Sequence, residues 1–292
     1  MLGYSDMTRD EQCLLEEKYN GKKTVAYGAD RERLARGEPL AYVIGWQPFL
    51  GLKIHLDSKP LIPRPETEWW TERLFRHIST VISGTSASDG ERHEQIFSRK
   101  LCVPRNHGAD VRFLDLCAGS GAIGCAALAQ LPNAEVYFGD IDPVHETTIA
   151  KNIRENHLDE SRAHIRIGDL FSAIGGPASG EGDVQFDIIA ANPPYVPVGR
   201  ALPASVSEYE PARALYAGAD GLDVIRRIAA ELPKHLARNG TAWIECDSSH
   251  AAALHPTARR SVACSLFKEQ GFHTEIRNDQ YGNPRIIVVS FL

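Results

Sequence analysis

The sequence predicts an α/β fold: a Rossmann-like, mostly parallel sheet with helices on both faces. Three observations lead to this prediction. From residue 111 onward, short apolar segments that suit buried strands alternate with helical segments. A glycine-rich loop joins the first of these strands to the first helix. The following strands end at polar residues, and ligands of such sheets collect at the carboxyl ends of the strands.

Three parts are expected along the chain. Residues 1–37 form a short helical N-terminal region, residues 38–62 a hairpin-like connector, and residues 63–292 the main domain. Inside the main domain, residues 83–109 are rich in serine, glycine and charged residues. Because such a composition buries little apolar surface, a flexible surface insertion is expected there.

Helices and an extended connector are expected ahead of the sheet. One or two helices fall within residues 8–37, and a hairpin-like extended segment follows over residues 40–60. A further helix begins near Glu66 and carries Trp69 and Trp70. Large aromatic side chains are usually buried, so these two are assigned to packing.

The C-terminal part is expected to close the sheet. A helix over residues 220–238 precedes a strand over residues 240–246, and the last strand covers residues 285–291. Between these two strands only a helix, near residues 258–270, is expected.

A glycine-rich loop follows the apolar strand of residues 111–116, and an alanine- and leucine-rich helix follows the loop. Glycines let the backbone approach a ligand closely, and a helix N-terminus favours a carboxylate or phosphate. The spacing of Gly119, Gly121 and Gly124 fits a dinucleotide fingerprint. Alone, that pattern has low specificity.

Acidic residues end the next two strands. Residues 135–139 lead to Asp140, about 20 residues after the loop, as expected for an acid that binds ribose hydroxyls. Asp142 then fits the N-cap of the following helix. The strand of residues 164–168 ends at Asp169, whose carboxylate could accept from an adenine amino group.

The turn Asn192-Pro193-Pro194-Tyr195 follows the apolar strand of residues 186–191. Two prolines rule out regular hydrogen-bonded structure and stiffen the backbone. Asn192 offers an acceptor and a donor, and Tyr195 a flat face that can stack on a planar group. The set suits a planar nitrogen, either an amide or the exocyclic amine of a base. A plain turn is the alternative, because Asn-Pro often starts turns.

Taken together, these motifs resemble a class I S-adenosylmethionine-dependent methyltransferase, and within that class the release-factor glutamine N5-methyltransferases. The resemblance covers roughly residues 38–292. The segments that carry it are Asp115-x-Cys117-Ala118-Gly119-Ser120-Gly121, Asp140, Asp169, Asn192-Pro193-Pro194-Tyr195, Glu38-Pro39-Leu40-Ala41-Tyr42-Val43-Ile44-Gly45, Phe49-x-Gly51-Leu52, Leu61-Ile62-Pro63-Arg64-Pro65-Glu66-Thr67-Glu68, Glu210-Pro211, Gly218-Ala219-Asp220-Gly221-Leu222-Asp223 and Asp279-x-x-Gly282-x-x-Arg285.

The chain departs from the family pattern in two places. The family's final sheet usually carries Glu-Ile-Gly and a later glutamine, where this chain reads Glu245-Cys246-Asp247 with His250. Relatives also carry several helices ahead of the segment that matches Glu38 to Gly45, while about 37 residues precede that segment here.

The resemblance implies S-adenosyl-L-methionine as the cofactor. Gly119 and Gly121 are expected at its methionine part, Asp140 at the ribose diol and Asp169 near the adenine. Asp115 is expected either to contact the cofactor ammonium group or to tie down the glycine loop. The implied cofactor-binding residues are Asp115, Gly119, Gly121, Asp140, Asp169, Leu170, Asn192, Pro65 and Thr67.

The resemblance assigns catalysis to Asn192, Pro193 and Tyr195. An amide nitrogen is a poor nucleophile because its lone pair is delocalised into the carbonyl group. The Asn192 side-chain oxygen and the Pro193 carbonyl are expected to accept the two amide hydrogens, and Tyr195 to pack on the amide plane. Pro194 and Glu210 complete the expected substrate-binding set, although a structural role suits Glu210 equally well.

By resemblance, the substrate is the glutamine of the Gly-Gly-Gln loop of a peptide chain release factor. Three alternatives stay open. A ribosomal-protein glutamine methyltransferase shares the core motifs but departs ahead of the first helix. An adenine-N6 nucleic-acid methyltransferase also uses an Asn-Pro-Pro-Tyr turn, with a flipped base. A non-catalytic binding protein would have kept the fold alone.

The composition excludes several other classes. The 292 residues carry a net charge of −6, with a pI near 6.0, which argues against direct nucleic-acid binding. No apolar run reaches the length of a membrane helix. A membrane partner is therefore not expected. The six cysteines form no C-x-x-C pair and the histidines show no metal-binding spacing, so a metal is not expected either. A monomer is expected.

The compartment depends on the source. The N-terminus lacks the apolar core of a secretory signal, and its acidic residues do not suit a mitochondrial transit peptide. By family resemblance, a bacterial member acts in the cytoplasm, and a eukaryotic member serves mitochondrial translation.

Overall fold

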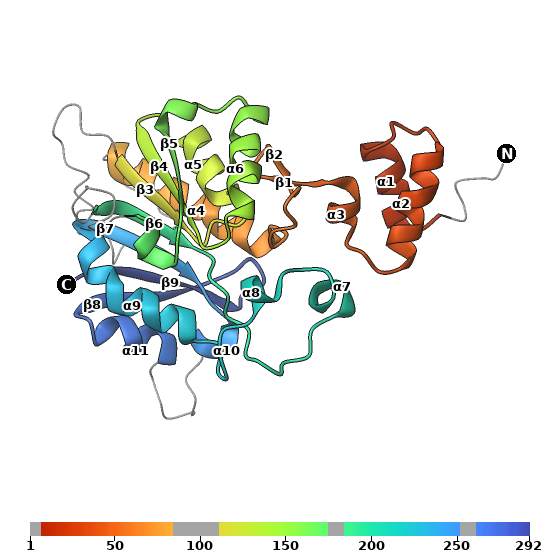
Figure 1. The fold of residues 1–292 in the computed structure, drawn as a ribbon. Helices are drawn as coiled ribbons and strands as arrows, with labels where there is room; N and C mark the ends of the chain where they lie inside the picture. The colour runs from red at the N-terminus through yellow and green to blue at the C-terminus, as the bar shows by residue number, and fades with distance from the viewer. Residues whose placement is uncertain (1–6, 84–110, 175–183, 252–260) are drawn as a thin grey trace.

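The computed structural model describes residues 7–83, 111–174, 184–251 and 261–292. The insertion expected at residues 83–109 lies, apart from Ser83, outside the described residues. The described chain contains a seven-stranded sheet, a two-stranded hairpin and the helices around them (Figure 1).

Three helices and a hairpin precede the large sheet. They are α1 (Arg9–Glu17), α2 (Val25–Ala35), α3 (Leu40–Ile44), β1 (Trp46–Phe49) and β2 (Leu52–His55). Helices α1 and α2 agree with the one or two helices expected within residues 8–37, and the hairpin of β1 and β2 lies within the extended segment expected over residues 40–60. The expectation of an extended segment is wrong for residues 40–44, because Pro39 caps a helical turn there. Gly45, with a φ of 99°, ends that turn in the left-handed conformation.

The main domain follows the predicted alternation of strands and helices. Its elements are α4 (Pro65–Ser83), β3 (Val111–Leu116), α5 (Ala122–Gln130), β4 (Ala134–Asp140), α6 (Val144–Glu155), η4 (Glu160–Arg162), β5 (Ala163–Ile167), η5 (Leu170–Ala173), β6 (Phe186–Ala191), α7 (Ala204–Ser207), α8 (Ala212–Leu215), α9 (Asp223–His235), β7 (Leu236–Glu245), α10 (Ser248–Ala251), α11 (Val262–Lys268), β8 (Phe272–Asn278) and β9 (Pro284–Phe291).

Strand β8 is not among the expected elements, since only a helix is predicted between the last two strands. It lies at one edge of the sheet and pairs with β9 alone. Phe272 and Thr274 are buried, while His273 between them is exposed. An edge strand with polar residues has a weaker apolar signal than a central one, which explains the omission.

The strands lie in the order β5-β4-β3-β6-β7-β9-β8. β3 to β7 pair in parallel, and β9 pairs antiparallel with both β7 and β8. The chain moves outward from β3 to β5 and then returns to place β6 beside β3. Ligands of such sheets bind where the strand order reverses. The sheet confirms the predicted Rossmann-like fold and points to the carboxyl ends of β3 and β6.

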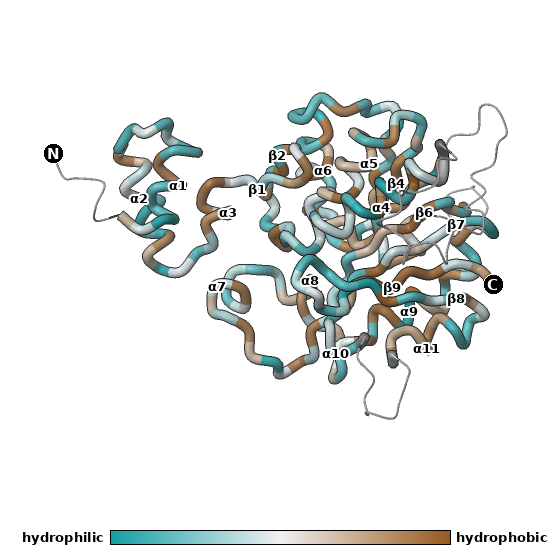
Figure 2. The backbone as a smooth tube through the Cα atoms, turned by 180° about the vertical axis from the view of Figure 1, so that it is seen from behind, coloured by the Kyte–Doolittle hydropathy of each residue, from teal (hydrophilic) through white to brown (hydrophobic). Residues whose placement is uncertain are grey.

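Helices cover both faces of the sheet. One hydrophobic cluster joins α4, α5 and α6 to side chains such as Phe113 and Ile188, and the other joins α9 and α11 to Leu114 and Ile189. Neighbouring residues of one strand thus serve opposite faces. Figure 2 shows hydrophobic residues along central strands such as β9. Trp70 is fully buried in the first cluster, which confirms its assignment to packing.

The hairpin is fastened to α6 by two asparagines. Asn156 Oδ1 accepts from the Lys53 N–H at 2.9 Å, and Asn152 Oδ1 accepts from the His55 N–H at 2.7 Å. Asn152 Nδ2 also donates to the Ser120 carbonyl at 2.9 Å. These bonds cover one edge of the hairpin and tie it to the glycine loop.

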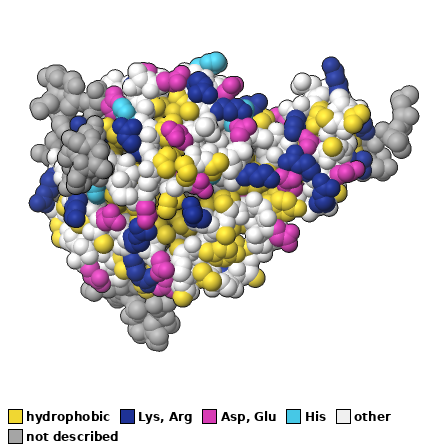
Figure 3. All heavy atoms as spheres, viewed as in Figure 1, with side chains coloured by type: hydrophobic (Ala, Val, Ile, Leu, Met, Phe, Trp, Pro, Cys, Tyr) yellow, Lys and Arg dark blue, Asp and Glu magenta, His cyan; other side chains and the backbone are white. Residues whose placement is uncertain are grey.

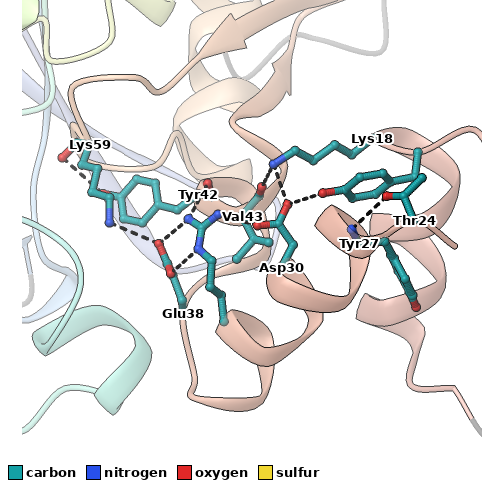
Figure 4. Close-up of polar contacts among 10 residues, drawn as sticks. Lys18, Thr24, Tyr27, Asp30, Glu38, Tyr42, Val43 and Lys59 are labelled. Atoms are coloured by element: carbon teal, nitrogen blue, oxygen red, sulfur yellow. Dashed lines mark hydrogen bonds and ion pairs between the residues drawn. The ribbon is translucent and has the colours of Figure 1, made fainter.

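Helices α1, α2 and α3 share a small apolar cluster, and α1 and α2 stand apart from the large sheet (Figure 1). Ala41 and Tyr42 of α3 belong to the first hydrophobic cluster of the main domain. Asp30 joins the helices, because it accepts from Lys18 Nζ at 2.7 Å, from the Tyr19 hydroxyl at 2.7 Å and from Arg33 at 2.8 Å (Figure 4). Lys18 Nζ also donates to the Val43 carbonyl of α3 at 2.6 Å. Burial, with the Asp30 carboxylate beside it, raises the pKa of Tyr19 to about 12.

Glu38 connects this helical region to the connector. It receives Arg33 Nε and a terminal Arg33 nitrogen at 2.8 and 2.7 Å, and Lys59 Nζ at 3.1 Å (Figure 4). The Arg33 hydrogen bonds, opposed by burial and aided by Lys59, lower the pKa of Glu38 to about 2. The pair is bidentate, which is the strong form of this contact.

Candidate active site

Two cavities lie at the carboxyl ends of the parallel strands. The larger, about 350 Å³, has Gly119 and Asp140 on its wall. The smaller has a volume of about 280 Å³. Asn192, Leu61 and Ala214 line both cavities and so form the boundary between them.

The glycine loop folds tightly over the end of β3. Gly119 and Gly121 have φ values of 53° and 76°, in the left-handed region that glycine favours. The Gly119 N–H donates to Asp140 Oδ2 at 2.7 Å. Gly124 has another role, because a Cβ there would lie 2.2 Å from the Phe138 ring. The third glycine of the fingerprint therefore lets α5 pack closely on β4.

Asp140 braces the loop from the neighbouring strand. Its second oxygen accepts from the Asp142 N–H at 2.9 Å. Asp142 in turn accepts from the Val144 N–H at 3.2 Å, at the start of α6. The N-cap of α6 is Pro143, so the prediction that places the cap at Asp142 is off by one residue. Asp140 is buried but lies on the wall of the larger cavity. Its carboxylate oxygens keep lone pairs that a ligand hydroxyl can use.

Asp115 lies beneath the loop rather than on a cavity wall. It is fully buried, and its Oδ2 accepts from the Gly124 N–H at 2.8 Å. Burial raises the pKa of Asp115 to about 8; the Gly124 bond opposes this shift and Asp140 adds to it. Of the two roles expected for Asp115, the contact that the structure contains is the one that ties down the loop.

Asp169 and Leu170 line the larger cavity after β5. Asp169 Oδ2 accepts from Arg227 at 2.8 Å, and its side chain remains about half exposed. Leu170 is buried and adopts a φ of 51°, which places it in the left-handed region. The larger cavity therefore has the Asp169 carboxylate beside the apolar side chain of Leu170, the two residues that the resemblance assigns to the cofactor site.

The start of α4 supplies a further wall of the larger cavity. Pro63 and Thr67 line it, but Pro65 lines neither cavity. Pro65 instead occupies the first position of α4, where its missing N–H costs nothing. Pro65 is among the residues implied to bind the cofactor, but in this segment Pro63 and Thr67, and not Pro65, lie on the wall of the larger cavity.

Glu210 ties the chain after the Asn192 turn to the segment ahead of α4. Its side chain accepts from the Ile62 N–H at 3.0 Å and forms an ion pair with Arg64. Glu210 is buried and lines neither cavity, whereas Arg64 lines the smaller one. The contacts of Glu210 therefore hold the segment ahead of α4 in place from behind the cavity wall.

The Asn192 turn continues directly from β6. Asn192 Nδ2 donates to Thr67 Oγ1 at 3.2 Å. Asn192 Oδ1 is buried and has no hydrogen-bond partner among the described residues. Pro194 lines the larger cavity and Pro193 the smaller. A buried acceptor without a partner, at the boundary of two cavities, is suited to receive an N–H from a ligand.

The position of Tyr195 is fixed by a hydrogen bond of its hydroxyl and by backbone hydrogen bonds of the next residue. Its hydroxyl donates to Glu245 Oε1 at 2.8 Å. Burial and the Glu245 carboxylate raise the pKa of Tyr195 well above 10. The next residue, Val196, bonds through its backbone to Leu215 and Ala217 at 2.8 and 2.9 Å. The phenol therefore stays neutral and its ring, on the wall of the smaller cavity, has a fixed position.

Glu245 lies beside the site, and the sequence analysis gives it no role there. It lies at the end of β7, is 1% exposed and contacts Thr67, Trp70 and Tyr195. Its signal in the sequence is a carboxylate at the carboxyl end of an apolar strand, as for Asp140.

No group of three or more His, Cys, Asp or Glu side chains among the described residues could hold a metal ion. None of the helices in this part of the chain is long and apolar enough to cross a membrane.

Known proteins resemble this chain over most of its length. A family model described as Conserved hypothetical protein 95 matches residues 94–219. A protein of Geobacter sulfurreducens named Release factor glutamine methyltransferase is 32% identical over 240 residues, which cover 82% of this chain and 71% of that protein. One of the same name from Rhodopirellula baltica is 31% identical over 270 residues, covering 91% and 78%.

A solved structure described as a SAM-dependent methyltransferase from Agrobacterium tumefaciens aligns with a TM-score of 0.46 at 13% identity, covering 84% of this chain and 68% of that one. Both of these sequence relatives are bacterial, and neither supports a mitochondrial location. The sequence similarity and the fold together place the chain in the release factor glutamine methyltransferase family, with a class I methyltransferase fold.

Proposed function

We propose that this protein transfers a methyl group from S-adenosyl-L-methionine to the side-chain nitrogen of the glutamine in the Gly-Gly-Gln loop of a peptide chain release factor. One observation carries the proposal. Asn192 stands on the boundary between two cavities and has a buried side-chain oxygen without a partner among the described residues. A methyl donor on one side and an amide on the other would meet there.

The larger cavity suits the cofactor. Its volume, about 350 Å³, falls in the range of small-molecule sites. The backbone of Gly119 and Gly121 would face the methionine part, Asp140 the ribose hydroxyls, and Asp169 with Leu170 the adenine. When bound, the cofactor supplies a methyl group on a positively charged sulfur. The carboxylates on the wall favour a cation there.

The protein side of the reaction is orientation of a weak nucleophile. Asn192 Oδ1 and the Pro193 carbonyl would accept the two amide hydrogens of the substrate, which aims its nitrogen at the larger cavity. The Tyr195 ring would pack against the amide plane. Fixed orientation of this kind contributes about 7–11 kcal/mol in favourable systems. Two acceptor dipoles also stabilise positive charge that develops on the nitrogen. The proton leaves after transfer, so no side-chain base is needed beforehand.

The smaller cavity suits a slender peptide segment. Apolar side chains such as Leu61, Val196 and Leu202 line it, and Arg64 and Arg200 stand on its wall. Both arginines are paired, with Glu210 and Asp247. A glycine-flanked glutamine could enter as an extended segment without placing other side chains in this narrow space.

A protein substrate agrees better with the surface than a nucleic acid does. On the face drawn in Figure 3, Lys and Arg side chains are interspersed with Asp and Glu rather than gathered into one basic stripe. The net charge is −6. Nucleic-acid binding depends on neutralising phosphates with a basic surface. The helices α1 and α2, which project away from the sheet in Figure 1, would contact the release factor outside the cavity.

The test is mass spectrometry of a purified release factor after incubation with this protein and S-adenosylmethionine. We expect a gain of one methyl group on the Gly-Gly-Gln glutamine, and no gain with Asn192→Ala. A release factor in which that glutamine is changed to alanine should stay unmodified. If the wild-type enzyme binds the cofactor by calorimetry but leaves the release factor unmethylated, the proposed substrate is wrong.

A further inference from the structure

Glu245 collects three hydrogen bonds in the core beside the Asn192 turn. Its Oε2 receives the Thr67 hydroxyl and the Trp70 indole N–H, each at 2.7 Å. Its Oε1 receives the Tyr195 hydroxyl at 2.8 Å. The residue is 1% exposed. Glu245 thus contacts two residues, Thr67 and Tyr195, that belong to the walls of the two cavities.

These contacts determine which group donates and which accepts in the hydrogen bonds that link Glu245, Thr67 and Asn192. A carboxylate only accepts, and an indole N–H only donates. The single proton of the Thr67 hydroxyl is therefore used on Glu245. Toward Asn192, at 3.2 Å, the Thr67 oxygen can only accept. Asn192 must then place its NH2 group at Thr67, and its carbonyl oxygen faces away.

The opposite orientation of the Asn192 amide would defeat the reaction. Its NH2 group would meet the NH2 group of a substrate amide, and its oxygen would meet a Thr67 oxygen that has no proton left to give. The observed orientation leaves Asn192 Oδ1 buried and unpartnered among the described residues. That is the arrangement an incoming N–H requires.

We propose that Glu245 is a positioning residue: through Thr67 it sets the orientation of the Asn192 amide, and directly it holds the Tyr195 ring, so that the site presents an acceptor to the nitrogen that is methylated. The role of these contacts in catalysis rests on the function proposed above. The orientation itself is a property of the folded protein and can be tested without a substrate.

Arg285 lies in β9 beside Ile286, the residue that pairs with Glu245 of β7. The ion-pair partner of Arg285 is Asp279, whose Oδ2 lies 3.5 Å from the Arg285 Nε. Burial lowers the pKa of Arg285, but the surrounding carboxylates, Glu245 and Asp279 among them, shift it upward overall. The positive charge of Arg285 therefore lies on the strand next to Glu245.

Two pairs of variants test the proposal. Thr67→Val removes the hydroxyl that Asn192 donates to, and Thr67→Ser keeps it. Glu245→Leu frees the Thr67 proton, and Glu245→Gln keeps an acceptor for Thr67 and Trp70. Thr71→Val is the matched control, since Thr71 is a buried threonine of α4 whose hydroxyl donates to the Thr67 carbonyl at 2.7 Å and not to Glu245.

The first readout is the side-chain amide signal of Asn192 in a 1H–15N spectrum, assigned by its loss in Asn192→Ala. We expect this signal to shift and to lose protection from hydrogen exchange in Thr67→Val and Glu245→Leu. It should return toward the wild-type position in Thr67→Ser and Glu245→Gln, and stay there in Thr71→Val. A wild-type signal in both Thr67→Val and Glu245→Leu overturns the proposal.

The second readout separates orientation from general stability. With a release factor as substrate, Thr67→Val and Glu245→Leu should lower kcat by about 10²-fold, the usual effect of removing one preorganised dipole. Thr67→Ser should recover most of that loss, and an equal loss in Thr71→Val would mean a merely structural effect. If the wild type does not methylate the release factor, the proposed function fails, while the Asn192 signal still decides the orientation. If one variant of a pair does not fold, the other pair gives the same comparison.

Discussion

Asn192 donates to the Thr67 hydroxyl across 3.2 Å, and this bond joins the end of β6 to the first turn of α4. Both residues line the larger cavity, which we propose for the cofactor. The two residues are 125 positions apart in the sequence. A change at either one is therefore expected to affect catalysis without unfolding the sheet.

Asn192→Ala should lower the kcat of methyl transfer by at least about 10²-fold, while cofactor affinity changes by only a few fold. The variant removes one of two acceptors for the substrate amide, and loss of one such dipole lowers kcat by about 10²–10³-fold. Turnover on a release factor and calorimetric titration of the cofactor measure the two effects. Asn156→Ala, which loses contacts to the hairpin but lies outside both cavities, serves as control. Loss of cofactor binding in a folded Asn192→Ala protein would contradict the assignment.

The sequence predicted most elements and their order because apolar runs and glycines report local structure directly. The loop from Gly119 to Gly124 and the acids that end two strands needed only spacing along the chain. The sequence does not predict β8, because an edge strand with a polar side has no such continuous run. It does not predict helix α3 either, because five residues are too few for a helical period to appear.

The partners within the site could not be predicted in the same way. Glu210 accepts from Ile62 over a separation of 148 residues, and Glu245 accepts from Thr67 over 178. Such pairs depend on how α4 packs against the sheet, and one sequence holds no direct signal of that packing. Pro65 was placed on the cavity wall from resemblance alone, whereas its position at the start of α4 turns it away from both cavities.

The Cys117 thiol should resist alkylation although it lines the larger cavity. Burial, with the Asp140 carboxylate nearby, raises the pKa of Cys117 above its ordinary value. The reactive species is the thiolate, so its fraction falls as the pKa rises. We expect iodoacetamide at pH 8 to modify Cys117 more than about tenfold slower in the folded protein than in urea, as followed by peptide mass spectrometry. Equal rates in the two states would mean that the thiol is open and ionised.

Glu38→Gln should destabilise the protein at neutral pH by about 1–3 kcal/mol, with part of the ion-pair energy screened by water. The pKa of Glu38 is lowered from 4.5 to about 2 in the fold, so the folded state binds fewer protons than the unfolded state. The stability it contributes is complete above about pH 4.5 and is lost as the pH falls toward 2.

Urea unfolding at several pH values measures this effect. The difference between wild type and Glu38→Gln should shrink as the pH falls below 4.5. Glu72→Gln is the control, because Glu72 also pairs with an arginine but is 44% exposed. If the two variants lose the same stability at pH 7, the Arg33–Glu38 pair does not hold the N-terminal helices to the connector.

Gly124→Ala and Gly28→Ala should have opposite effects on stability, although both glycines lie in helices. A Cβ at Gly124 would meet the Phe138 ring at 2.2 Å, between α5 and β4, so overpacking should cost about 1–3 kcal/mol. Gly28 lies inside α2 and a Cβ there meets nothing within 4 Å. Alanine should therefore stabilise that position by about 0.5–1 kcal/mol. Thermal unfolding of the two variants beside the wild type tests the pair. A neutral Gly124→Ala would mean that α5 can move away from β4, and that the third glycine of the fingerprint is not needed for their packing.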